Sequence, residues 1–184
     1  MRAAAKTPFS GSLALETTES NAVITRFLTL AVIAAVADLA TKAIATNLLQ
    51  NGHFVVFGGR AGLMLVYNTG VTGGASFGPL TMLLNVVTTC LAIVMVIWIV
   101  KPLSAVDPRA TVALALVSGG AFGNLASMLA GPEGVADFIA VRLAGATTVV
   151  MNVADLLLWS GALMLAPVVL TLIRKVRAQR ALAG

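Results

Sequence analysis

Residues 79–100 are PLTMLLNVVTTCLAIVMVIWIV, a run without a charged side chain. A helix of about 20 apolar residues crosses the hydrocarbon layer of a membrane, which is about 30 Å thick. Three similar runs, at about 22–49, 110–129 and 148–173, contain very few charges. Because backbone polar groups in lipid need partners within their own segment, runs of this length are predicted to be helices. The sequence therefore predicts an all-α membrane protein with four transmembrane helices.

The composition excludes the class of water-soluble proteins. Of the 184 residues, 59% are hydrophobic and only 10% are charged, whereas soluble domains carry about 25% charged residues. We divide the chain into a polar N-terminal segment at 1–21, a membrane domain at 22–174 and a basic tail at 175–184. The segment 1–21 lacks the pattern of a cleavable signal peptide, so the first apolar run is predicted to remain as a membrane anchor.

Basic residues are distributed unevenly among the connecting segments. Only Arg60 and Arg142 lie in the loops after the first and third runs. Nine others lie at the two ends of the chain or between the second and third runs: Arg2, Lys6, Arg26, Lys101, Arg109, Arg174, Lys175, Arg177 and Arg180. Since Lys and Arg accumulate on the cytoplasmic side, both termini are predicted to be cytoplasmic. The net charge of +5 is thus interpreted as a topology signal and not as a nucleic-acid site.

The first outer loop, residues 50–78, is predicted to contain β-structure. The segments 53–57 and 63–67 are rich in β-branched and aromatic residues and are separated by Gly58-Gly59, which is typical of two short strands. The loop ends in a glycine-rich stretch from Asn68 to Gly78, where irregular turns are expected. We therefore expect a small β-sheet on the outer face, between the first and second helices.

Four ionisable residues within or next to the spans are candidates for a functional site. A charge at membrane depth is costly and persists only when it is paired or faces a wet cavity. Asp38 and Lys42 are four residues apart, so they fall on one helix face and are expected to form a bracing ion pair. Asp155 has no basic neighbour in its own span, and Asp137 lies near the same outer level. A bond from Asp155 to Lys42 on another helix is the structural alternative.

Two carboxylates at one membrane level indicate acid–base chemistry. When they lie close together they cannot both ionise, so one keeps a proton. The ionised carboxylate can then take a proton from water while the protonated one polarises a peptide carbonyl. A zinc site is disfavoured because the chain has one histidine, His53, and one cysteine, Cys90.

Small residues in the third span predict close helix packing. Gly119 and Gly123 are four residues apart on one face, and such spacing lets helices approach closely. The same approach would bring Asn124 near a neighbouring helix.

Taken in order, these motifs resemble the bacterial signal peptidase II family, the lipoprotein signal peptidases. The resemblance covers most of residues 25–172 and is carried by sequence elements in the first, third and fourth spans and the two outer loops: Asp38-Leu-Ala-Thr-Lys42, Asn68-Thr-Gly70 with Ala75-Ser-Phe-Gly78, Gly119-Gly-Ala-Phe-Gly-Asn124, Val135-Ala-Asp137-Phe138 and Asn152-Val-Ala-Asp155. It implies an aspartic endopeptidase of the bacterial inner membrane that removes signal peptides from diacylglyceryl-modified prolipoproteins and needs no metal or cofactor.

The resemblance also implies roles for individual residues. Asp137 and Asp155 would be the catalytic pair. The supporting or substrate-binding residues would be Asn68, Gly70, Asn124, Asn152, Asp38 and Lys42. The outer sheet would cradle the substrate at the surface of the membrane lipid, where globomycin-type inhibitors would also bind.

One departure from the family pattern bears on activity. Where the family usually has Asp-Arg, this chain has Ser127-Met128, and methionine cannot replace the fixed cation. Arg142 in the second outer loop is a candidate replacement. Three functions stay open: a peptidase, a non-catalytic protein that binds lipidated or signal peptides, and a small proton-linked transporter.

Overall fold

Four long helices and one small sheet make up the protein in the computed structural model, which describes residues 8–49, 55–57, 59–69, 78–130, 134–143 and 147–183. The helices are α1 (Pro8–Leu49), α2 (Thr81–Val106), α3 (Arg109–Ala130) and α4 (Val153–Ala183), and a short 3-10 turn, η1 (Gly78–Leu80), precedes α2. Each long helix contains a stretch long and apolar enough to cross a membrane. The prediction of a four-helix membrane protein is confirmed.

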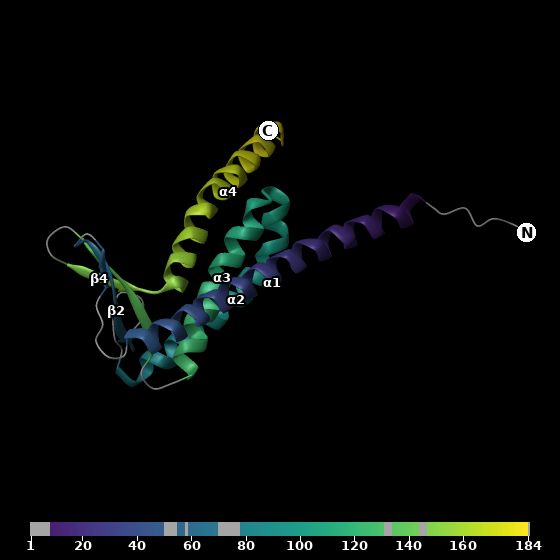
Figure 1. Cartoon of the computed structure of the whole chain (residues 1–184). Coiled ribbons are helices and arrows are strands. Elements are labelled where there is room, and N and C mark those ends of the chain that lie inside the picture. The colour runs from purple at the N-terminus through teal and green to yellow at the C-terminus, as the bar shows by residue number, and fades with distance from the viewer. Residues whose placement is uncertain are drawn as a thin grey trace, which may run out of the picture.

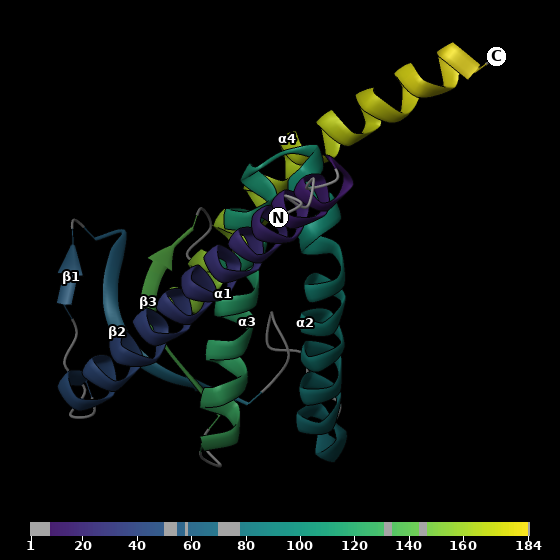
Figure 2. The same cartoon turned by 90° about the vertical axis from the view of Figure 1, so that its right-hand side faces the viewer.

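Helix α3 is the central helix, with α1, α2 and α4 packed around it (Figures 1 and 2). Its glycines explain how closely the neighbours approach. A Cβ atom added to Gly119 would lie 2.5 Å from Cβ of Ala34 on α1, and one added to Gly120 would lie 2.7 Å from the carbonyl oxygen of Ala154 on α4. Such contacts leave no room for a side chain, as small-residue packing between membrane helices requires.

The sheet lies at one end of the helices (Figure 1) and has four antiparallel strands in the order β1-β2-β3-β4. Strands β1 (Val55–Phe57) and β2 (Ala61–Asn68) come from the connection between α1 and α2, as predicted. Strands β3 (Val135–Arg142) and β4 (Thr148–Met151) come from the connection between α3 and α4 and were not predicted. The pairing of β2 with β3 therefore joins the two connections into one layer.

The helix ends differ from those predicted. Helix α1 begins at Pro8 instead of Ala22, so much of the polar N-terminal segment is helical, and α4 continues through the basic tail to Ala183. The predicted start of the fourth helix at Thr148 is wrong, because 148–151 form strand β4. That stretch, Thr-Val-Val-Met, is short, apolar and β-branched, and such a run fits a strand as well as a buried helix.

Alternation along β3 directs neighbouring residues to opposite faces. Phe138 is buried against Ala45 and Leu49 at the end of α1, and these contacts attach the sheet to that helix. Asp137, the preceding residue, is also buried. The strand thereby holds a carboxylate on the face opposite to the one that packs on α1.

At the other end of the helices, Asp107 closes the turn between α2 and α3. Its Oδ1 accepts the Arg109 backbone N–H at 3.0 Å, and its Oδ2 lies 3.0 Å from the Arg109 guanidinium. The hydrogen bonds from Arg109 hold the pKa of Asp107 below its usual range. Lys175 on α4 donates to the Val106 carbonyl at 2.9 Å, so α4 is tied to the same turn.

Candidate active site

The first turn of α4 holds Asp155 in a reciprocal cap. The Asp155 backbone N–H donates to Oδ1 of Asn152 at 3.1 Å, and the Asn152 backbone N–H donates to Oδ2 of Asp155 at 2.9 Å. Asn152 directly precedes the helix and Asp155 is its third residue, which is the spacing of a capping box. The free N–H groups of a helix start favour negative charge, so the Asp155 carboxylate is electrostatically stabilised.

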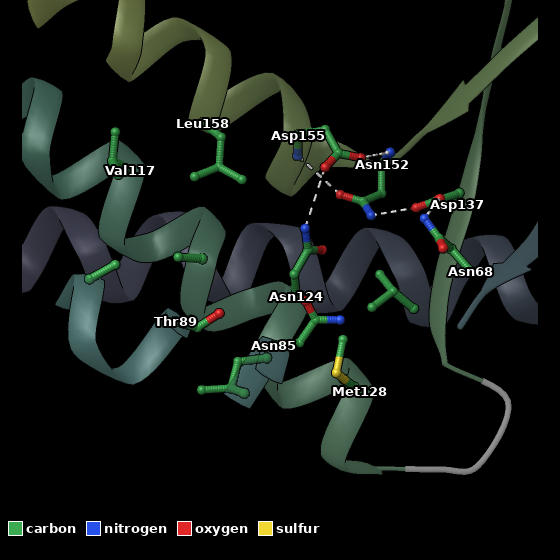
Figure 3. A pocket seen from close by; sticks show the side chains of 14 residues that line it. Asn68, Asn85, Thr89, Val117, Asn124, Met128, Asp137, Asn152, Asp155 and Leu158 are labelled. Atoms are coloured by element: carbon green, nitrogen blue, oxygen red, sulfur yellow. Dashed lines mark hydrogen bonds between the residues drawn. The ribbon is translucent and has the colours of Figure 1, made fainter. Parts of the chain in front are cut away.

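Asp137 is joined to this cap through Asn152. The Asn152 side-chain amide donates to Oδ1 of Asp137 at 2.6 Å, and the Asn68 amide, at the end of β2, donates to Oδ2 at 3.3 Å. Asn152 is 1% exposed and Asp137 is 6% exposed. One buried asparagine therefore bridges the two aspartates, which come from a strand and a helix separated in the chain by β4 (Figure 3).

The protonation of Asp137 is shifted by its surroundings. Burial raises the pKa of its carboxyl above the usual range, and the nearby Asp155 carboxylate adds to the shift. The hydrogen bonds from Asn152 and Asn68 and the charge of Lys42 act in the opposite direction without cancelling the effect. Of the two carboxyls, Asp137 is therefore the one that its surroundings favour to hold a proton.

Asp38 and Lys42 form the predicted ion pair, with 2.7 Å between Nζ and Oδ2. Lys42 also donates to Oδ1 of Asn124 at 2.7 Å, and the Asn124 amide donates to Oδ1 of Asp155 at 3.4 Å. Oδ1 of Asp38 accepts the backbone N–H of Ala154 at 2.8 Å. Lys42 is therefore linked to Asp155 through Asn124, and Asp38 satisfies a free N–H at the start of α4.

A cavity of about 270 Å³ lies between α2, α3 and α4, with both aspartates at its sheet end (Figure 3). Its polar lining at that end consists of Asn68, Asn124, Asp137, Asn152 and Asp155. Farther along the helices much of the lining is apolar: Ala92, Val117, Ala121 and Leu158. The cavity is thus a largely apolar channel along membrane-spanning helices that ends at two carboxylates.

Asn85 and Thr89 of α2 also line this cavity, and the sequence did not single them out. The sequence feature that could have identified them is their spacing: two polar residues four positions apart lie on one face of a helix within an uncharged span. Neutral polar residues cost less in lipid than charges, so this signal is weak beside that of the aspartates.

Comparison with known proteins supports this architecture. A family model described as signal peptidase (SPase) II matches residues 30–171, well over half of the chain.

The chain belongs to the signal peptidase II family.

It is thus a member of a peptidase family of lipoprotein processing. The chain is also similar to two solved structures, each described as a bacterial membrane enzyme structure obtained by the in meso method. For the structure at 2.3 Å resolution, the TM-score is 0.70 at 22% identity, over 80% of this chain and 88% of the other. For the structure at 1.9 Å, the TM-score is 0.69 at 22% identity, over 80% and 94%. At this identity the likeness shows the shared fold. A search of curated proteins found no match.

The structure places the two residues that depart from the signal peptidase II pattern on different surfaces. Met128 lines the cavity of the aspartates, whereas Ser127 lines a neighbouring hollow together with Lys42 and Tyr67. None of the described residues that line the aspartate cavity is a lysine or an arginine. The position at which the family usually carries a cation thus faces the site and is occupied by a thioether.

Arg142 does not supply the missing cation. It is exposed at the end of β3, five residues after Asp137, and it does not line the cavity. Five residues of strand span about 16 Å, and an odd separation directs the two side chains to opposite faces. The proposed replacement by Arg142 is therefore wrong.

Three sequence expectations lie outside the described residues: the role of Gly70, the irregular turns over residues 70–77 and the sheet position of His53. Within the part of the chain that is described, no group of three or more His, Cys, Asp or Glu side chains is arranged to hold a metal ion.

Proposed function

We propose that this protein is an intramembrane aspartic endopeptidase that removes signal peptides from diacylglyceryl-modified prolipoproteins, cutting before the lipid-bearing cysteine. The observation that supports this most strongly is the Asn152 bridge between Asp137 and Asp155, at the end of a membrane-level cavity. The apolar part of that cavity suits the hydrophobic segment of a signal peptide. Its polar end would then receive the scissile bond.

In the proposed reaction, Asp155 is the base and Asp137 the acid. The Asp155 carboxylate takes a proton from water, and the water oxygen attacks the scissile carbonyl carbon. Protonated Asp137 donates a hydrogen bond to the carbonyl oxygen and stabilises the charge that develops there. The proton held by Asp155 then passes to the leaving amine nitrogen as the C–N bond breaks. The helix start around Asp155 and the buried position of Asp137 favour this division.

The supporting residues act through the two aspartates. Asn68 and Asn152 orient the Asp137 carboxyl, and Asn124, fixed by Lys42, orients Asp155. Asp38 holds the first turn of α4 in place. Gly70 is assigned to the substrate loop on family resemblance alone.

We place the protein in the bacterial inner membrane with both termini cytoplasmic and the site at the outer face, as the distribution of basic residues indicates. Its partners would be membrane lipid and lipid-modified prolipoproteins. A globomycin-type inhibitor would occupy the aspartate cavity. No cofactor is required by the proposed chemistry.

One observation favours a second candidate, a weakened or inactive paralogue that binds lipidated or signal peptides. Met128 stands in the cavity wall where the family usually has arginine, and no described basic residue lines that cavity. Such a protein would keep the channel and its affinity for the peptide but would not cleave it.

A cleavage assay separates the two candidates. The purified chain in lipid or detergent should cleave a lipidated prolipoprotein, and Asp155→Asn and Asp137→Asn should each lower the rate by roughly 10²–10⁴-fold, since each removes an acid–base group. Glu19→Gln, which changes an exposed carboxylate of α1 away from the cavity, is the control and should not alter the rate. Binding without cleavage by the native chain would favour the inactive paralogue.

A further inference from the structure

Helix α2 presents two polar side chains to the aspartate cavity from within a membrane span. Asn85 and Thr89 both line the cavity, on the side that also holds Met128 and Asn124 (Figure 3). They are four residues apart, so they lie on one face of α2, about 6 Å from each other along the helix axis. The span around them is apolar, with a mean hydropathy of 2.6, and only 6% of it is buried inside the protein, so most of α2 is left to face lipid.

Thr88, the residue directly before Thr89, shows how a lipid-facing threonine is satisfied in this helix. It is exposed, does not line the cavity, and donates its hydroxyl to the Leu84 carbonyl of its own helix at 2.7 Å. Such a bond satisfies the hydroxyl without any partner outside the helix. Thr89 is half-buried and faces the cavity instead. Contact with lipid therefore does not explain the polar side chains that α2 presents to the cavity.

A signal peptide in this channel would need hydrogen-bond donors at that level. It crosses lipid as a helix, because its backbone groups must be paired. At the scissile bond the helix has to end, since a peptidase must reach a carbonyl that is not enclosed in helix. The last four carbonyls of a helix have no partner within it, and leaving them unpaired in an apolar environment is costly.

We propose that Asn85 and Thr89 are positioning residues that donate hydrogen bonds, from Nδ2 and Oγ1, to the free carbonyls in the last turn of the signal-peptide helix. This inference rests on the proposed function and adds the part of the substrate that α2 recognises. Two donors about 6 Å apart along α2 come close to the rise of about 4.5 Å between the first and the last of the four free carbonyls, which lie on nearly the same face of the helix. Met128, on the same cavity, has no hydrogen to donate, so the neutral donors of α2 supply the contact.

The test measures binding separately from cleavage. The chain carrying Asp155→Asn, reconstituted in lipid nanodiscs, is titrated with a fluorescent lipidated signal peptide that extends past the cleavage site. Adding Asn85→Leu or Thr89→Val should raise the Kd about tenfold each, the effect of one buried hydrogen bond. Thr88→Val makes the same chemical change on the lipid-facing side and should not alter the Kd. Thr89→Ser keeps the hydroxyl and should bind as the parent does.

In the chain with both aspartates intact, the same changes should raise KM and leave kcat nearly unchanged, because the contact is present before and during the reaction. Equal Kd values for the Thr88→Val and Thr89→Val variants overturn the inference, and so does a parent chain that binds no peptide. If the native chain cleaves the substrate but the Asn85→Leu and Thr89→Val variants bind it as the parent does, the proposed function stands and the inference about α2 is wrong. If the Kd values follow the expected pattern but the native chain never cleaves, the inference about α2 stands and the proposed peptidase activity is wrong.

Discussion

At the scale of single residues, the site is built from asparagines around two aspartates. Asn152 accepts one hydrogen bond from the backbone of Asp155 and donates another to Asp137, which a residue with only donors or only acceptors could not do. Asn124 likewise accepts from Lys42 and donates to Asp155. An amide with both functions can therefore join groups of either charge without adding a charge of its own.

The sequence identified a site residue when placing its side chain in lipid costs a large free energy. Asp38, Lys42 and Asp155 stood out because a charge in an apolar run needs an explanation. Asn85 and Thr89 did not, because neutral polar side chains are tolerated in spans and can bond to their own helix, as Thr88 does. Their orientation toward the cavity depends on how α2 packs, which no local pattern encodes.

The raised pKa of Asp137 predicts how stability depends on pH. The folded chain keeps the Asp137 proton to a higher pH than the unfolded chain, in which the carboxyl titrates at about 3.9. The free energy of unfolding should therefore fall as pH rises from about 4 through the raised folded pKa, and then level off. In the Asp137→Asn variant this part of the fall should disappear. Thermal unfolding between pH 4 and 8, followed by tryptophan fluorescence, measures the difference.

The variant Met128→Arg is a second arm of that pH experiment. A guanidinium in the aspartate cavity would stabilise the ionised form of Asp137 and lower its folded-state pKa. The fall in stability should still begin near pH 4, where the unfolded chain titrates, but it should end at a lower pH and be smaller. Met128→Leu, which changes the shape of the wall without adding charge, should behave as the native chain. If the native and Asp137→Asn chains lose stability in parallel as pH rises, the buried Asp137 is not the group that titrates.

At the scale of elements, the start of α4 is fixed by α1 as well as by its own cap. Asp38, which is fully buried, accepts the Ala154 N–H and is neutralised by Lys42. Gly123 permits this arrangement, because a Cβ atom there would overlap the Asp38 carboxylate. The ion pair thus connects three helices: α1 carries it, α3 makes room for it, and α4 is held by it.

Lys42→Met tests that connection. It removes the cation and leaves Asp38 as an unpaired buried charge, which should lower the free energy of unfolding by about 3–5 kcal/mol. The double variant Asp38→Asn with Lys42→Met removes both charges but keeps an oxygen that can accept the Ala154 N–H, so it should recover part of the loss. Thermal unfolding in one detergent compares the three chains. A double variant less stable than Lys42→Met would show that the ion pair does not act through charge.

Elements were predicted well where a single run of sequence determines them. All four helices follow from length and apolarity, and β1 and β2 from a loop rich in β-branched residues. Strand β4 was assigned to a helix because Thr148–Met151 is too short to show a period. Strand β3 contains Asp137 between buried residues, and was interpreted as a loop because that carboxylate interrupts the apolar run.

At the scale of the whole molecule, the site depends on pairing between distant parts of the chain. β2 follows α1, β3 follows α3, and their register places Asn68 opposite Val135 and Val66 opposite Asp137. That register brings the Asn68 amide to the Asp137 carboxyl, and β4 then leads directly into Asn152 and α4. Sequence motifs could list these residues, but the sheet that joins them follows from long-range contacts.

The helix lengths predict which end of the molecule protrudes from the membrane. Helix α4, Val153–Ala183, has 31 residues, a length of about 46 Å, whereas the hydrocarbon layer is about 30 Å thick. Since α4 starts beside the sheet, the excess of about ten residues lies at its C-terminal end, where α4 extends past α2 and α3 (Figure 2). That end carries Arg174, Lys175 and Arg177, and we predict from these basic residues that it lies in the cytoplasm.

Single cysteines should report this orientation directly. In a chain whose only native cysteine is removed by Cys90→Ala, Arg142→Cys lies at the exposed end of β3 and Gln179→Cys lies on the exposed extension of α4. If the sheet faces outward, as the distribution of basic residues predicts, a membrane-impermeant maleimide applied to intact spheroplasts should label the Arg142→Cys chain. It should label the Gln179→Cys chain only after the membrane is broken. The opposite pattern would place the aspartate cavity at the cytoplasmic face, where a peptidase acting on exported prolipoproteins could not meet its substrate.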